Sequence, residues 1–307
     1  MKLSSLLLAA FALATTGINA EPAKIKCLII DGQNNHKWQD TTPLLKTILE
    51  QSGVFSVDVS TTPPAGAKKP GAPNEAKPAW DQWKPRFADY GVIVSNYNGQ
   101  AWPKELHDAL VSYVKNGGGF VSYHAADNSF GDQADYNEMI GLGGWGGRNA
   151  KSGPYLRLRD GAWKPVEGPG PCGGHGPQDE FIIKTFAPEH PIMKGLPPQW
   201  MHAKDELYHS LRGPAKNLAV LGHALSEQTN EEEPMLMAIS YGKGRVFHTT
   251  LGHYVEALDG LGFQVTLTRG TEWAATGKVT QPAPKPGELS AGPKAALRPL
   301  KPAPGNR

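Results

Sequence analysis

Short apolar runs alternate with segments of helical periodicity through the first half of the chain. Residues 25–30 form an apolar run, interrupted only by Lys26, as expected of a short strand covered on both faces. In residues 42–51 leucine and isoleucine recur at helical spacing, which predicts a helix with one buried stripe, ended by Gly53. The alternation continues with strands predicted at 55–59, 91–95 and 120–123, and with a second helix from Pro103 to the glycines 117–119.

The second half of the chain continues this pattern more loosely. Strands are predicted at 180–184, 218–221, 235–240 and 245–249, and a closing helix at 263–275. Alternating strands and helices predict an α/β fold with an open, mostly parallel sheet and helices on both faces. Because no repeat or linker interrupts residues 21–278, we expect them to form a single domain.

Two stretches rich in glycine and proline show neither helical nor strand periodicity. Residues 61–79 carry five prolines and no large apolar side chain, which predicts a mobile surface insertion. Residues 142–178 either form a long excursion over the active face or are loosely structured.

Both ends of the chain are expected to lie outside the fold. Residues 1–20 have a positive Lys2, a short apolar stretch and a small residue last, which is typical of a signal peptide and too short to span a bilayer. The alternative is a buried N-terminal helix, which the polar break at Glu21 and Pro22 disfavours. Residues 279–307 hold seven prolines and no aromatic residue, which predicts a disordered tail. We therefore expect an exported protein, periplasmic or extracellular, without stable membrane insertion after cleavage.

Charge and cysteine content narrow the function classes further. The formal net charge is +2, but the tail contributes +4 and Lys2 contributes +1, so residues 21–278 are near −3. Such a domain lacks the clustered basic face that nucleic acid requires. Two cysteines exclude a disulfide scaffold. Cys27 lies in a predicted strand and Cys172 in a loop, so free thiols are favoured over a disulfide, and no motif supports Cys172 as a nucleophile.

Polar side chains follow four of the predicted strands. In an open α/β sheet, ligands bind at the carboxyl ends of the strands. Four separate segments therefore bring imidazole, carboxylate and amide groups toward one edge, which predicts a shared site. The residues are Asp31, Asn34, Asn35, His36 and Trp38; Asn96, Tyr97 and Asn98; His124, Asp127 and Asn128; and His253.

His124 is the most informative of these positions. A strand runs directly into it, and small residues then start a helix, as in a nucleophile elbow. An imidazole at such a point can act as base, acid, nucleophile or metal ligand near neutral pH. The plain alternative is that His124 only caps the helix.

Two further segments carry titratable groups. Asp205 and Glu206 precede Tyr208, and this set can orient an imidazole, bind sugar hydroxyls or ligate a metal; its alternative is a salt-bridged surface turn. His175 lies among glycines in what is predicted to be a flexible loop that carries an imidazole; its alternative is a plain loop. The motifs of zinc proteases, zinc fingers, serine hydrolases and P-loop NTPases are absent from the sequence.

Five separated blocks together resemble the ThuA-like (trehalose utilisation) family over roughly residues 24–276. They include Asp31-Gly32 with His36 and Trp38, the Gly118–Ala126 block around His124, His190-Pro191-Ile192, Asp205-Glu206-Leu207-Tyr208, and the block from Gly242 to His253. The family is similar in fold to class I glutamine amidotransferases, which have a flavodoxin-like sheet. The cysteine of their elbow is His124 here, so thiolate amidotransferase chemistry is not expected.

The resemblance implies carbohydrate catabolism, with a disaccharide, glycoside or 3-keto derivative as substrate. Acid/base chemistry would then fall to His124 and Glu206 as the leading pair, with Asp205 and His175. A divalent transition metal, held by His36, His124 and His253, would act as Lewis acid if the three rings lie within about 8 Å. Sugar-binding groups would be Asn35, Trp38, Asn98, Asp127 and Tyr208.

Two other functions remain open at this level. The same polar edge in a non-catalytic carbohydrate-binding or scaffold domain would hold a sugar without converting it. A regulatory relative of the amidotransferases is less favoured, because an exported protein has little use for channelled ammonia. The expected partner in the first two cases is a small sugar, with neither nucleic acid nor membrane involved.

Overall fold

The computed structural model describes residues 23–66, 78–289 and 292–300. The predicted signal peptide, most of the predicted insertion at 61–79 and the last seven residues lie outside this part of the chain. None of the helices in the described ranges is long and apolar enough to cross a bilayer.

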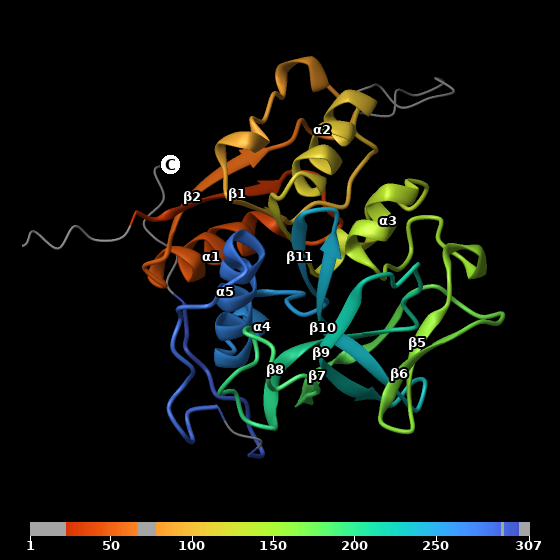
Figure 1. Ribbon diagram of the computed structural model, residues 1–307, viewed down its shortest axis with the longest axis vertical. Helices are drawn as coiled ribbons and strands as arrows, with labels where there is room; N and C mark the ends of the chain where they lie inside the picture. The colour runs from red at the N-terminus through yellow and green to blue at the C-terminus, as the bar shows by residue number, and fades with distance from the viewer. Residues whose placement is uncertain (1–22, 67–77, 290–291, 301–307) are drawn as a thin grey trace, which may run out of the picture.

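A nine-stranded sheet in the order β2-β1-β3-β4-β11-β10-β9-β7-β8 forms the centre of the molecule (Figure 1). The first five strands in this order are parallel, and their 2-1-3-4-5 order is that of a flavodoxin-like doubly wound sheet. The other four are antiparallel. The parallel strands are β1 (Ile25–Asp31), β2 (Phe55–Thr61), β3 (Val92–Ser95), β4 (Gly119–Tyr123) and β11 (Gly244–Thr249). The antiparallel strands are β7 (Gly174–Thr185), β8 (Gln199–His209), β9 (Leu218–Ser226) and β10 (Glu231–Tyr241).

Helices cover both faces of the parallel half, as predicted. α1 (Trp38–Gln51), α4 (Val255–Leu258) and α5 (Leu261–Thr276) pack on one face, and α2 (Lys104–Lys115) and α3 (Ala134–Ile140) on the other (Figure 1). Strand β1 shows why its sequence is apolar throughout. Cys27 and Ile29 point into the core under α1 and α5, whereas Leu28 and Ile30 point into the core under α2.

The stretch 142–178 is more ordered than its composition suggested. It contains a hairpin of β5 (Tyr155–Arg159) and β6 (Ala162–Val166), turned by Asp160 and Gly161 at φ 52° and 74°. An Asp-Gly pair favours this turn, because both central residues need positive φ. Arg157 and Arg159 of β5 pair with Glu233 and Glu231 of β10, which fastens the hairpin to the main sheet.

The predicted disordered tail is corrected by the structure. Residues 279–289 and 292–300 pack against α5 and its neighbours, and Leu289 is buried. The Glu272 carboxylate accepts hydrogen bonds from the backbone and hydroxyl of Thr280 and from the backbone of Gln281. The backbone amides of Arg298 and Leu300 donate to Asp259. Hydrogen bonds to Glu272, which is buried, and to Asp259, which is half-buried, therefore hold a segment that has little apolar surface of its own.

Arg269 on α5 connects this C-terminal segment to the body of the protein. Its side chain is 3% exposed and donates to the carbonyl oxygens of Ile192, Gln281, Pro191 and Lys194 at 2.7–2.9 Å. The guanidinium thus holds two loops that are distant in sequence.

Replacing Arg269 by alanine should lower the melting temperature by about 6–12 °C. Orphaning buried carbonyls bonded to a charged donor costs about 3 kcal/mol, and each kcal/mol is worth about 2–4 °C in a domain of this size. Arg86→Ala is the matched control, because this exposed side chain forms an ion pair with Asp89 at the surface. Equal melting temperatures for the two variants, measured by calorimetry, would contradict the assigned role of Arg269.

Candidate functional site

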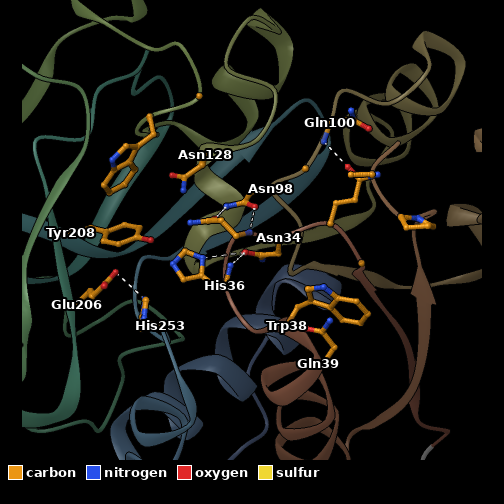
Figure 2. Close-up of a pocket in the computed structure, with 18 of the residues that line it drawn as sticks. Asn34, His36, Trp38, Gln39, Asn98, Gln100, Asn128, Glu206, Tyr208 and His253 are labelled. Atoms are coloured by element: carbon orange, nitrogen blue, oxygen red, sulfur yellow. Dashed lines mark hydrogen bonds and ion pairs between the residues drawn. The ribbon is translucent and has the colours of Figure 1, made fainter. Parts of the chain in front are cut away.

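The polar site lies at the carboxyl ends of the parallel strands, where the sequence placed it (Figure 2). His36 follows β1, His124 follows β4 and His253 follows β11. Their ring centroids are 4.8 Å apart for His36 and His124, 4.7 Å for His36 and His253, and 5.4 Å for His124 and His253. Three imidazoles from separate segments therefore meet within the range required for one shared ion.

His124 occupies the predicted elbow. Its φ of 44° lies in the left-handed region, where β4 turns sharply into the short helix His124–Asn128. Its Nδ1 lies 2.7 Å from the Thr250 carbonyl oxygen, and since a carbonyl only accepts, Nδ1 carries the proton. The lone pair is then on Nε2, which faces the Tyr208 hydroxyl at 2.9 Å. The ring thus bonds to Thr250 and Tyr208 instead of to the backbone of the following helix, which argues against the capping alternative.

His36 is held in the same tautomer by a side-chain amide. Its Nδ1 lies 3.1 Å from Asn34 Oδ1, which also accepts a hydrogen bond from the His36 backbone. Asn34 is fixed in turn by Asn96. Burial, and then the neighbouring His124 and His253, lower the pKa of His36 to about 3. Burial also lowers the pKa of His124. Both rings are therefore neutral near physiological pH, the form in which imidazole binds a metal.

Glu206 and His253 complete the group. His253 Nδ1 lies 2.9 Å from Glu206 Oε2. Burial opposes the charge on both groups, but their attraction prevails: it lowers the pKa of Glu206 and raises the pKa of His253. The second oxygen of Glu206 lies 3.7 Å from His175 Nδ1. Glu206 is thus an ionised carboxylate beside three imidazoles.

These four side chains fit a divalent transition metal. Each of His36, His124, Glu206 and His253 offers one ligand atom, and all four atoms lie within 4.8 Å of one another. Three imidazole nitrogens and one carboxylate oxygen form a donor set typical of zinc and related transition metals. Carbonyl and amide oxygens that fix the ring orientation, as Thr250 and Asn34 do here, are the usual outer partners of metal-binding histidines.

A cavity of about 930 Å³ opens beside this group. His36, Glu206, Tyr208 and His253 line one end, and Trp38, Gln39 and Gln100 lie toward the other (Figure 2). Apart from histidines and the phenol of Tyr208, Glu206 is the only ionisable side chain of the described residues that lines it. The walls carry seven side-chain amides: Gln33, Asn34, Asn35, Gln39, Asn98, Gln100 and Asn128.

The sugar-binding residues predicted from the sequence separate into two groups. Asn35, Trp38, Asn98 and Tyr208 line the cavity, and so does His175 at its rim. Asp127 does not: it is fully buried, and its Oδ2 lies 3.5 Å from His248 Nε2. Because its carboxylate has no exposed surface, Asp127 is not placed to touch a ligand in the cavity.

Asp205 is also placed differently from expectation. Its carboxylate is fully buried and accepts hydrogen bonds from His202 Nε2 and from the backbone amides of Glu206, Gly252 and His253, at 2.7–2.9 Å. Burial opposes its ionisation, but these donors, led by His202, lower the pKa of Asp205 overall. Asp205 therefore positions the turn that carries His253, instead of acting on a ligand itself.

Trp145 was missed by sequence reasoning. It lies at φ 47° between glycines, lines the cavity, and packs edge-on against Tyr208 with ring centroids 4.8 Å apart. Its signal was available: it is a lone aromatic residue in the glycine-rich run at 143–147. Together with Gly146 and His175 it makes 142–178 part of one cavity wall, so this stretch is an excursion over the site and not a loose loop.

Both cysteines are free, as predicted. Burial raises the pKa of the Cys27 thiol and of the Cys172 thiol, so both thiolates are disfavoured. Neither residue lines the cavity. The structure therefore gives no support to a cysteine nucleophile.

Fold and site define a flavodoxin-like α/β protein whose elbow residue is His124. The chain belongs to the ThuA family: the family model described as trehalose utilisation matches residues 26–274. A ThuA-like protein from Parabacteroides merdae is 42% identical, with a TM-score of 0.82 over 90% of this chain and 98% of that one. A ThuA-like protein from Bacteroides uniformis, 20% identical, shares the fold with a TM-score of 0.54, covering 86% of this chain and 97% of that one. No curated protein matches the chain.

Proposed function

We propose that this protein is an exported enzyme that acts on a disaccharide or glycoside, or on its 3-keto derivative, by metal-assisted acid/base chemistry. One observation carries the proposal: three histidines and a glutamate meet at one end of a large, amide-lined cavity. His36, His253 and Glu206 line that cavity, and His124 is buried against His36. Export rests on the signal-like sequence of residues 1–20.

The lining supports a neutral polyol as ligand. Side-chain amides both donate and accept hydrogen bonds, which suits sugar hydroxyls. Trp38 and Trp145 offer apolar faces for the C–H surface of a sugar ring. Lysine and arginine, the usual partners of phosphate and carboxylate groups, do not occur among the described lining residues. The cavity thus favours an uncharged sugar over a sugar phosphate or sugar acid.

A 3-keto-glycoside gives this site a reaction to perform. A base removes the proton from the carbon beside the carbonyl, and the electron pair moves to the carbonyl oxygen. When the carbonyl re-forms, the bond from the next carbon to the glycosidic oxygen breaks, and the departing alcohol takes up a proton. A bound divalent metal would supply Lewis-acid stabilisation of the charged oxygen.

His175 is the imidazole best placed to take the proton. It lines the cavity, its side chain is 44% exposed, and it is not one of the four grouped ligands. Its Nδ1 lies 2.8 Å from the Gly176 carbonyl oxygen, so Nδ1 carries the proton and Nε2 is free to accept one. If His124 and Glu206 bind the metal, the acid/base role predicted for that pair passes to His175.

The proposal is tested by incubating the purified protein with 3-keto-disaccharides and their parent disaccharides. We expect released monosaccharide, detected by mass spectrometry, from the keto compounds. A chelator should abolish the release, and one added transition metal should restore it. Tight sugar binding by calorimetry with no product from any compound would overturn the proposed enzymatic function. It would favour a non-catalytic carbohydrate-binding domain.

A further inference from the structure

The Tyr208 hydroxyl and a metal ion would compete for the same atom of His124. Because the Nδ1 proton of His124 is donated to Thr250, Nε2 has a single lone pair, and Tyr208 donates its hydroxyl hydrogen to it at 2.9 Å. A lone pair given to a metal cannot also accept that hydrogen bond. Metal binding through Nε2 would therefore free the hydroxyl of Tyr208.

We propose that Tyr208 is a hydrogen-bond donor to the substrate oxygen that becomes negatively charged, and that metal binding to His124 releases it for this role. The inference rests on the proposed function, since it assigns a residue to the same site. It makes specific the role predicted for Tyr208 from the sequence, where this residue was expected to be one of the sugar-binding groups.

The position of Tyr208 supports this role. Its side chain is almost fully buried, yet it lines the cavity at the same end as Glu206 (Figure 2). The hydroxyl lies one hydrogen-bond length from a ligand atom, so the freed donor stays beside any oxygen bound at the metal. Its ring packs against Trp145 and His124, with centroids 4.8 Å and 4.5 Å away, which limits its movement. A donor held in this way needs no reorganisation during the reaction.

The test is Tyr208→Phe, which removes the hydroxyl and keeps the ring. The variant should bind zinc or cobalt about two- to tenfold more tightly in a chelator competition, because the apoprotein no longer gives up a hydrogen bond. Turnover of the keto-sugar should fall about 100-fold, the usual effect of losing one oxyanion donor. Metal addition should also change the near-ultraviolet tyrosine absorption of the wild type, and this change should be lost in the variant.

Tyr90→Phe is the matched control, because its hydroxyl bonds to Asp58 at the surface. It should keep wild-type metal affinity and turnover. Weaker metal binding by Tyr208→Phe, or unchanged turnover with unchanged affinity, would overturn the role of Tyr208 and leave the proposed function in place. Failure of the wild type to bind any metal would overturn both.

Discussion

Replacing His124 by asparagine should reduce turnover about 1,000-fold and remove the bound metal. Charge stabilisation by a metal is worth several kcal/mol, and each 1.4 kcal/mol corresponds to a factor of ten in rate. The melting temperature of the metal-free protein should fall by only a few degrees. Asparagine tolerates the left-handed conformation at φ 44°, so the elbow can keep its backbone.

His190→Asn is the control for this substitution. His190 is half-buried in a turn, packs against Trp273 and lies outside the site. We expect wild-type turnover and metal content. The assigned role of His124 would be wrong if His124→Asn kept near-normal turnover, measured by steady-state kinetics with the keto-sugar. A fall of more than about 10 °C in the melting temperature of the metal-free variant would indicate a structural role instead.

Replacing Asp205 by asparagine should weaken metal binding, although Asp205 is not one of the four proposed ligands. The buried carboxylate accepts four hydrogen bonds, and an amide puts an N–H₂ group where an acceptor is needed. At least one buried donor, such as the Gly252 amide, is then unpaired, which costs about 3 kcal/mol with the lost charge. The 252–253 turn should shift, and metal affinity should fall about 10- to 100-fold, as for other outer-sphere substitutions.

The readouts are a calorimetric melting temperature and a metal dissociation constant. Asp108→Asn is the matched control, because Asp108 forms an ion pair with Lys104 on the exposed face of α2. Asp205→Asn with normal stability and affinity, but with lost turnover, would show that Asp205 acts on the substrate, as first predicted from the sequence.

The convergence of the histidines was predictable because it depends on a general rule. Each of His36, His124 and His253 follows a segment that was predicted as a strand, and the carboxyl ends of parallel strands share one edge. The order of strands is not needed for that conclusion. No comparable rule predicts the antiparallel strands from β10 to β8, and β8 was not predicted.

The missed strand explains the wrong role for Asp205. Side chains alternate between faces along a strand, so Asp205 and Glu206 point in opposite directions. Glu206 and Tyr208 share the face toward the cavity, whereas Asp205 is buried on the other. Had 199–209 been predicted as a strand, this alternation would have divided the two carboxylates between a positioning role and a ligand role.

The C-terminal segment shows that composition alone does not predict whether a segment is ordered. Seven prolines and few apolar residues predicted disorder beyond residue 278, yet Glu272 and Arg269 of α5 bind residues 280–281 by hydrogen bonds, and Asp259 binds Arg298 and Leu300. Such long-range pairing depends on buried charged groups in another element. The local sequence of the segment does not reveal it.

Metal content tests the central claim most directly. The protein and its His124→Asn and His36→Asn variants would be purified without chelator and measured by plasma mass spectrometry. The proposed site predicts about one equivalent of a transition metal per wild-type chain and almost none in either variant. A metal-free wild type that also takes up no zinc, cobalt, nickel or manganese on dialysis would contradict the metal centre. The histidines would then serve plain acid/base catalysis or sugar binding.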